Sequence, residues 1–239
     1  PSDFNPEKSY PVLDASASDN LPVGSFTNGG AMGTFYAAGA AYAELGFIVV
    51  MVASRGTGYR SKAFRADKLS GGFDCPNIPD HIAAIEQLAQ RYPYMDLDRV
   101  GVVTQTSSAL AAYGVLQYPD FYRVGICVNA GLDRRLSGAF VETYYTAGLA
   151  PESNNRAELS ELAHQLKGKL LIVHGMMDDV IPVAAAFRLI EALQAANKNV
   201  DMLLLPNLGH GPSQYVQRCA WDYVVTHLLG EEPPVGFAL

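Results

Sequence analysis

The stretch "DRVGVVTQTSSALAAYGVL", residues 98–116, decides the fold class of this chain. It reads as a short apolar strand, then a polar turn, and then a helix of small residues. Further apolar runs of strand length alternate with helical patterns along the chain, at 10–16, 47–53, 124–130, 169–175 and 200–206. Such alternation, with strands rich in Val, Ile and Leu, is typical of a mainly parallel sheet with helices on both faces. The sequence therefore predicts an α/β fold in a single domain, residues 1–239.

Helical patterns fill the gaps between these strands. One of them, "DHIAAIEQLAQRY", has amphipathic spacing, and Asp80 at its start is a candidate N-cap. The other predicted helices cover 34–45, 108–117, 182–196 and 214–229, with a helical insertion around 134–166.

Composition excludes several classes of protein. The 239 residues carry a net charge of −7, whereas a nucleic-acid-binding surface needs clustered Lys and Arg. No apolar run is long enough to span a membrane, so we expect a soluble domain, and the compartment stays open between cytoplasmic and periplasmic or secreted. Cys75, Cys127 and Cys219 are widely spaced, which fits buried free thiols better than a disulfide framework or a zinc site. We expect no metal and no cofactor.

Three loops after predicted strands carry groups that work together in nucleophilic catalysis. Hydroxyl side chains follow the predicted strand at 99–103. Asp178 and Asp179 follow the predicted strand at 169–175, and His210 follows the one at 200–206. The carboxyl ends of parallel strands share one edge, so we expect these groups to lie close together. A hydroxyl becomes a nucleophile when an imidazole accepts its proton, and a carboxylate holds that imidazole in the required tautomer.

Each group also has a plain structural interpretation. The hydroxyls of 106–108 are typical N-capping residues for the helix that follows, and the paired aspartates are candidate caps for the helix after Pro182. His174, at a strand end beside the aspartates, lacks a second histidine at ligand spacing, which disfavours a metal site. The order and placement of hydroxyl, acid and histidine favour the catalytic interpretation.

Over nearly its whole length the sequence resembles the catalytic domain of the prolyl oligopeptidase family, in its dipeptidyl peptidase IV-like branch. The segments that carry the resemblance are "ELGFIVVMVASRGTGYRSKAF", "IPDHIAAIEQLAQRYPYMDLDRVGVV", "VETYY", "KLLIVHGMMDDVIP", "NKNVDMLLLPNLGHG" and "RCAWDYVVTHLLGEEPP". The resemblance implies an α/β-hydrolase fold and a serine-peptidase ancestry, with Asp178 as the triad acid and His210 as the triad base. It also implies an N-terminal β-propeller and first strands of the sheet that these residues do not include.

The sequence departs from the family pattern at the nucleophile. Counting from Arg99 without gaps places Thr106 at the nucleophile position, with Thr104 and Ser108 where the family has glycines. A shift by one residue makes Ser107 the nucleophile, but it requires an insertion in a buried strand. In either register the glycines are lost that normally let the nucleophile adopt a strained, positive φ.

Other departures lie nearby. Ala17 stands about where the family has its oxyanion tyrosine, and an alternative register puts Asn28 there. Ala53 and Ser54 replace an acidic residue before the Arg-Gly loop, and Val180 replaces a polar residue after the aspartates. We take Asn28, Ser108 and Glu142 (of the "VETYY" landmark) as candidates for oxyanion or substrate contacts.

Two main functions follow from these matches and departures, and a third, less favoured one is a hydrolase-fold protein that uses His210 and Asp178 as an acid/base pair without a nucleophile. The first is a serine hydrolase in which Ser107 or Thr106, with His210 and Asp178, cleaves a peptide or a small amide or ester. The alternative is a catalytically silent relative, a pseudoenzyme that serves in binding or assembly. For the C-terminal helix and the tail "PPVGFAL", a subunit contact and an ordinary surface both stay open.

Overall fold

The computed structural model describes residues 1–16, 39–57, 61, 63–64, 75, 77–105, 109–136, 158–211 and 213–236. Six strands form one sheet, in the order β2-β1-β3-β4-β5-β6. Their bounds are β1 Tyr10–Asp14, β2 Ile48–Val50, β3 Met95–Gln105, β4 Tyr122–Val128, β5 Lys169–Gly175 and β6 Asp201–Leu205. All five strand pairs are parallel, so the carboxyl ends lie along one edge of the sheet.

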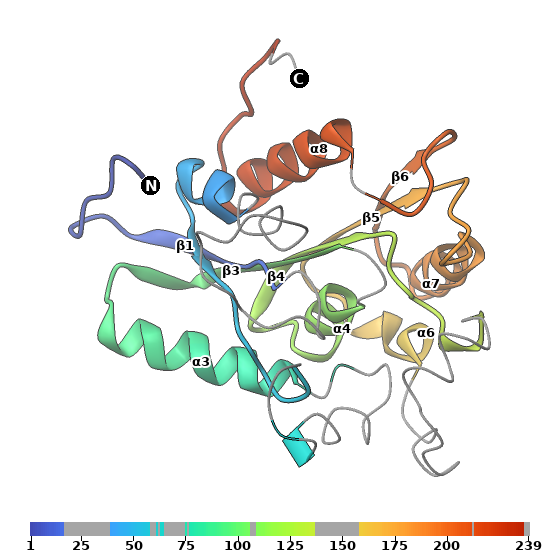
Figure 1. Cartoon of the computed structure of the whole chain (residues 1–239), viewed down its shortest axis with the longest axis horizontal. Coiled ribbons are helices and arrows are strands. Elements are labelled where there is room, and N and C mark those ends of the chain that lie inside the picture. The colour runs from blue at the N-terminus through green and yellow to red at the C-terminus, as the bar shows by residue number, and fades with distance from the viewer. Residues whose placement is uncertain are drawn as a thin grey trace.

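Helices cover both faces of this sheet, as Figure 1 shows. One face carries α8 (Gln214–Val224), which continues into a π-helical turn at Val225–Leu229, together with the helical residues 39–44. The opposite face carries α3 (Ile78–Arg91), α4 (Leu110–Gln117), α6 (Leu159–Leu162) and α7 (Ala184–Ala195). Short 3₁₀ turns lie at Arg134–Leu136 and Ala163–Gln165. The predicted parallel sheet with helices on both faces is confirmed.

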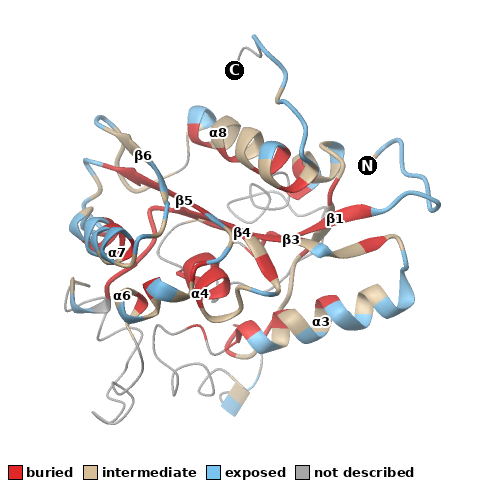
Figure 2. Ribbon diagram, turned by 180° about the vertical axis from the view of Figure 1, so that it is seen from behind, coloured by how far each residue is buried: buried red, intermediate tan, exposed pale blue. Residues whose placement is uncertain are grey.

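The strands β1, β4 and β5 are buried on both faces, because successive side chains point to opposite sides of the sheet and helices cover both sides. Val12 packs into the apolar core beneath α3 and α4, whereas its neighbour Leu13 packs into the core beneath α8. Figure 2 shows β4 and β5 largely buried between helices whose outer surfaces are exposed, whereas β6 at the edge of the sheet is exposed to intermediate. This two-sided burial explains why the strands are continuous apolar runs in the sequence.

Small residues let α4 pack closely on the sheet. The helix is buried from Leu110 to Leu116. A side chain added at Gly125 of β4 would lie 2.8 Å from Val115 and 3.1 Å from the carbonyl oxygen of Ala111. The glycine therefore allows a close approach between α4 and β4.

Asp80 is not an N-cap, so that prediction is wrong. Helix α3 begins at Ile78, its N-cap residue is Asn77, and Asn77 makes no side-chain capping bond. Asp80 lies in the first turn and accepts three hydrogen bonds from Arg55, at 2.6, 2.8 and 2.9 Å. The bonds from Arg55 hold the pKa of Asp80 below its ordinary value. For this carboxylate, the bidentate contact with a guanidinium is a stronger interaction than an N-cap hydrogen bond.

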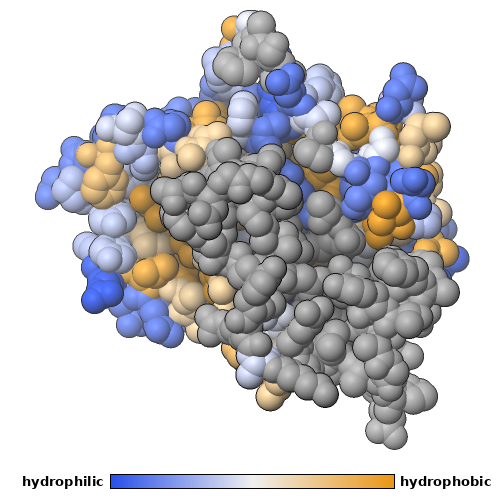
Figure 3. All heavy atoms as spheres, in the orientation of Figure 1, coloured by the Kyte–Doolittle hydropathy of each residue, from blue (hydrophilic) through white to orange (hydrophobic). Residues whose placement is uncertain are grey.

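Cysteine burial follows the prediction at two of three positions. Cys75 and Cys127 are both buried, and burial raises the pKa of Cys127 to about 12. Cys219 on α8 is only partly buried. Among the described helices, none has both the length and the apolar character to cross a membrane. In the space-filling view of Figure 3, hydrophilic and hydrophobic residues are interspersed over the described surface.

Candidate active site

Asp178 lies in the loop that follows β5, and its own loop holds its carboxylate in place. Oδ1 accepts hydrogen bonds from the backbone N–H groups of Val180 and Ile181, at 2.9 and 2.8 Å. The side chain is fully buried. The carboxylate does not cap α7, whose N-cap residue is Val183 and has no side-chain capping bond. Asp178 therefore has one oxygen fixed by the backbone and the other directed at a histidine.

That histidine is His210, in the loop after β6. Its Nδ1 lies 2.9 Å from Asp178 Oδ2. Because the carboxylate is an acceptor, Nδ1 carries the proton and Nε2 is left with a lone pair. The side chain is 17% exposed, and no described residue hydrogen-bonds Nε2. The pair thus has the orientation and the access that a general base requires.

Backbone hydrogen bonds join the loop after β5 to the loop after β6. Met177 N–H donates to the carbonyl oxygen of Leu208 at 3.0 Å, and Met176 N–H donates to that of Leu205 at 2.9 Å. A side chain added at Gly175 would lie 2.3 Å from the Leu208 carbonyl oxygen, so only glycine permits this approach. Acid and base are 32 residues apart in sequence, yet neighbouring parallel strands bring them together.

The structure brings together two of the site residues predicted from the sequence, Asp178 and His210. Thr106, Ser107 and Ser108 lie outside the described residues, as do Asn28, Ala17 and Glu142. Strand β3 ends at Gln105, directly before these hydroxyls in the sequence, and its carboxyl end lies at the same sheet edge as those of β5 and β6. The described residues thus include Asp178 and His210 but not the hydroxyls of residues 106–108.

His174, the last residue but one of β5, lies behind this pair. It is buried, its Nε2 donates to the carbonyl oxygen of Ile181 at 3.0 Å, and the same atom lies 3.6 Å from Asp178 Oδ2. His174 therefore supports the turn that holds Asp178. Over the described parts of the chain, no group of three or more His, Cys, Asp and Glu side chains is placed to hold a metal ion.

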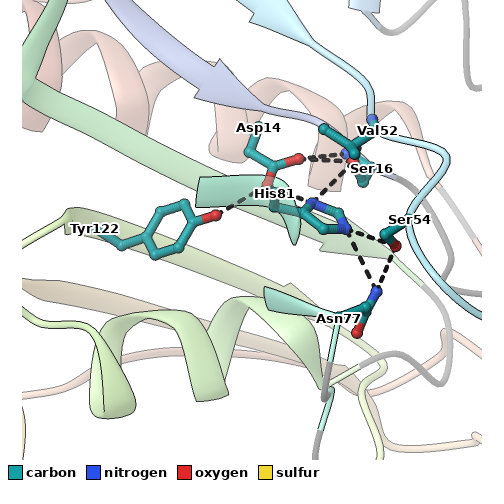
Figure 4. Close-up of polar contacts among 7 residues, drawn as sticks. All are labelled: Asp14, Ser16, Val52, Ser54, Asn77, His81 and Tyr122. Carbon is teal, nitrogen blue, oxygen red and sulfur yellow. Dashed lines mark hydrogen bonds and ion pairs between the residues drawn. The ribbon is translucent and has the colours of Figure 1, made fainter. Parts of the chain in front are cut away.

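A second Asp–His pair lies buried near the ends of β1 and β2, and sequence analysis missed it. His81 Nδ1, on α3, lies 2.8 Å from Asp14 Oδ2 at the end of β1. His81 Nε2 lies 3.0 Å from Ser54 Oγ, in the loop after β2. Figure 4 shows the three side chains in line, with Asn77 donating from its amide to Ser54 Oγ at 2.8 Å. The bonds have the connectivity of a Ser-His-Asp triad.

Further donors surround Asp14 in this buried network. Ser16 Oγ donates to its Oδ1 at 2.7 Å, and Tyr122 OH donates to its Oδ2 at 3.1 Å (Figure 4). Burial by itself would raise the pKa of Asp14, but attraction to His81 and the bonds from His81, Ser16 and Tyr122 outweigh burial and lower it. Burial and the neighbouring Asp14 charge raise the pKa of Tyr122, which stays a neutral donor.

The buried network holds elements together instead of presenting a nucleophile. Asp14 and His81 are at most 1% exposed, and Ser54 is 4% exposed. Ser54 Oγ is already engaged by His81 and Asn77, and Val52 N–H donates to Ser16 Oγ at 3.1 Å. These bonds join β1, the loop after β2 and the first turn of α3.

Two sequence signals pointed to this network. His81 lies on the buried stripe of α3, three residues after Ile78 and four before Ile85. A histidine on such a stripe needs a polar partner, because an unpaired buried polar group is costly. The second signal was Ser54, which with Ala53 stands where the family pattern has an acidic residue before the Arg-Gly loop.

Comparison with known proteins identifies the lineage of this site. A model of the prolyl oligopeptidase family matches residues 34–229. The chain belongs to this family. Dipeptidyl peptidase 8 from Homo sapiens is 29% identical over 221 residues, an alignment that covers 88% of this chain and 24% of that protein. Dipeptidyl peptidase 8 from Mus musculus matches with the same identity and coverage.

Solved structures of peptidases share the fold. Dipeptidyl peptidase 4 of Porphyromonas gingivalis superposes with a TM-score of 0.75 at 25% identity, covering 95% of this chain and 33% of that one. An acylaminoacyl peptidase in complex with a chloromethyl ketone superposes with a TM-score of 0.78 at 17% identity, covering 98% and 39%. The α/β-hydrolase fold expected from the sequence is thus confirmed, and the chain is a hydrolase-family domain. It spans about a quarter of the length of its prolyl oligopeptidase-family relatives.

Proposed function

We propose that this domain is a serine hydrolase in which His210 is the general base and Asp178 orients it. The observation that carries the proposal is the 2.9 Å contact between His210 Nδ1 and Asp178 Oδ2, with Nε2 unoccupied by any described residue. The nucleophile is a hydroxyl of the turn at 106–108, either Ser107 or Thr106. That turn follows β3, and the acid and base follow β5 and β6 on the same sheet edge.

The proposed chemistry is acyl transfer in two steps. The hydroxyl oxygen attacks the acyl carbon of the substrate while its proton passes to His210 Nε2. His210 then gives that proton to the departing amine or alcohol, which leaves an acyl-enzyme. A water molecule, deprotonated by the same Nε2, attacks the ester, and the hydroxyl regains its proton as the acid departs. Asp178 keeps its charge throughout and stabilises the imidazolium.

The proposed substrate is a peptide or a small amide or ester. Family membership supports acyl substrates, and the matched relatives are named as dipeptidyl peptidases. In its full-length form we propose that the protein carries a further N-terminal domain, since the relatives are about four times as long as the matched chain. Substrate selection by such a domain would narrow the range of peptides that reach His210.

A fluorophosphonate probe with intact-mass detection tests the proposal directly. The probe phosphonylates an activated hydroxyl, so we expect one adduct on the wild-type protein. The adduct should vanish in His210→Ala and in one of the two variants Ser107→Ala and Thr106→Ala, which names the nucleophile. Asp179→Ala is the matched control, because this neighbour of Asp178 is exposed, whereas His210 is bonded to Asp178, so labelling should be unchanged.

A folded wild-type protein that forms no adduct would contradict the proposal and favour the silent relative. The specific observation behind that second candidate is the loss of glycines around the turn, with Thr104 and Ser108 in their place. A cooperative thermal transition shows that the unlabelled protein is folded.

A further inference from the structure

Asn129 occupies an unusual position directly after β4. It is 2% exposed, and its backbone has a φ of 50°, in the left-handed region that few residues other than glycine adopt. Asparagine is the side chain that tolerates this conformation best. Its N–H still donates to the carbonyl oxygen of Val173 at 2.9 Å, so the residue remains attached to β5.

The side chain of Asn129 bonds to both loops of the candidate active site. Its Oδ1 accepts from Gly175 N–H at 2.9 Å, at the start of the loop that carries Asp178. Its Nδ2 donates to the carbonyl oxygens of Gly209 and Gly211, at 3.3 and 3.4 Å. These two glycines flank His210 in sequence. One buried amide therefore fixes the acid loop on one side and the backbone on both sides of the base.

Only an amide of this length can make all three bonds. Alanine or glycine would leave the Gly175 N–H and two carbonyl oxygens without their partner. An aspartate would keep the acceptor for Gly175, but its second oxygen would face two carbonyl oxygens with no proton to donate. A buried carboxylate in that position is also penalised by desolvation. The hydrogen-bonding groups around this position thus favour asparagine over aspartate.

We propose that Asn129 is a positioning residue that holds His210 in bonding distance of Asp178. The backbone bonds between the two loops join Met176 and Met177 to residues 205 and 208, upstream of the histidine. Among the described residues, Asn129 is the one whose side chain hydrogen-bonds the backbone of residues 209–211. Without it the peptide units on either side of His210 are free to rotate, and the imidazole leaves the carboxylate. This inference rests on the proposed function for its catalytic meaning, but the geometry is testable by itself.

The test uses the imidazole Nδ1 protons in a proton NMR spectrum. A histidine Nδ1–H that donates to a carboxylate gives a signal far downfield. The described residues include two such bonds, His210–Asp178 and His81–Asp14. The variants His210→Gln and His81→Gln assign the two signals. In Asn129→Asp and in Asn129→Gly we expect the His210 signal to disappear while the His81 signal remains, which also proves that the variant is folded.

Two control variants separate the role of Asn129 from ordinary damage. Asn77→Asp makes the same chemical change in a buried asparagine of the other network, and it should disturb the His81 signal while leaving that of His210. Asn197→Gly changes an exposed asparagine with a φ of 54°, and both signals should stay. If the labelling reaction succeeds, Asn129→Asp should lower kcat for a small ester roughly a hundredfold with little change in KM, as expected when a catalytic group is misplaced.

The outcomes are distinguishable from failure of the proposed function. The NMR signals need no nucleophile, so a protein that never reacts with the probe still tests the positioning. Persistence of the His210 signal in both Asn129 variants would overturn the inference. Absence of that signal from the wild-type spectrum, with the His81 signal present, would overturn it as well. Loss of the His210 signal alone supports it.

Discussion

The molecule contains two Asp–His pairs that are almost alike in geometry and opposite in access. The two atoms Nδ1 and Oδ2 are 2.9 Å apart in the pair of His210 and Asp178, and 2.8 Å apart in the pair of His81 and Asp14. The first imidazole is 17% exposed, and no described residue hydrogen-bonds its Nε2. The second is 1% exposed, and its Nε2 contacts Ser54. Bond geometry alone therefore does not make an active site.

The difference lies in what each pair connects. His210 and Asp178 sit on loops, at the sheet edge where a substrate can approach. His81 and Asp14 sit on α3 and β1, which the network ties to the loop after β2. The first arrangement suits chemistry, because its base can exchange a proton with a ligand. The second suits stability, because every bond in it joins two parts of the chain.

The largest expected effect comes from replacing one aspartate in each pair by asparagine. Asp178→Asn should lower the rate of ester hydrolysis by about 10⁴, since the amide holds the imidazole in the wrong tautomer. Asp14→Asn should leave the rate per folded molecule within about twofold. Steady-state hydrolysis of a small activated ester, normalised to the folded fraction, measures both. Equal losses in the two variants would contradict the division of roles.

Replacing each histidine by leucine should affect stability in the opposite order, with the larger loss in the buried pair of His81 and Asp14. His81→Leu removes one of three side-chain partners of the buried Asp14 carboxylate, and loss of a partner from a buried ion pair typically costs about 3–5 kcal/mol in the free energy of unfolding. His210→Leu should cost no more than about 1 kcal/mol, because the His210 side chain is 17% exposed, so water can reach the carboxylate oxygen that it leaves, and Asp178 keeps its two backbone N–H donors. Urea unfolding followed by circular dichroism measures both. A His81→Leu protein as stable as wild type would show that the buried network contributes little.

The buried carboxylate also predicts how stability depends on pH. The pKa of Asp14 lies below its ordinary value in the folded protein, so its charge contributes stability above about pH 4. That contribution is lost as pH falls through the lowered pKa. Asp14→Asn should therefore be less stable at neutral pH but lose less free energy on acidification, and the two curves should converge. Urea unfolding at a series of pH values from about 7 to 2 checks this, and parallel curves would contradict it.

Most of the fold was predictable because the strands carry a strong signal. All six strands match apolar runs, since a parallel sheet buried on both faces needs residues such as those of β4 and β5 to be apolar throughout. The end of a helix was less predictable. Asp80 has the composition of an N-cap, but its position in the first turn and its contact with Arg55 depend on a loop 25 residues away in sequence.

The candidate site was predictable only where order along the chain carries information. Asp178 and His210 follow adjacent strands, so their meeting could be predicted from the sequence. Asn129 and the buried pair could not be found in this way. Asn129 acts through three backbone groups whose positions appear only in the fold, and Asp14 and His81 are 67 residues apart with no motif joining them.

The smallest expected effect is also the one that tests the comparison most directly. Ser54→Ala removes the hydroxyl between His81 Nε2 and the Asn77 amide. We expect a loss of about 1–3 kcal/mol in the free energy of unfolding, because two buried polar groups lose a partner. Fluorophosphonate labelling and ester hydrolysis should be unchanged, since a hydroxyl that is 4% exposed and already bonded on both sides does not meet a substrate. Ser16→Ala, a second buried hydroxyl of the same network, is the matched control for stability. Loss of the adduct in Ser54→Ala, with the adduct kept in Ser16→Ala, would reverse the assignment and make the buried array the reactive one.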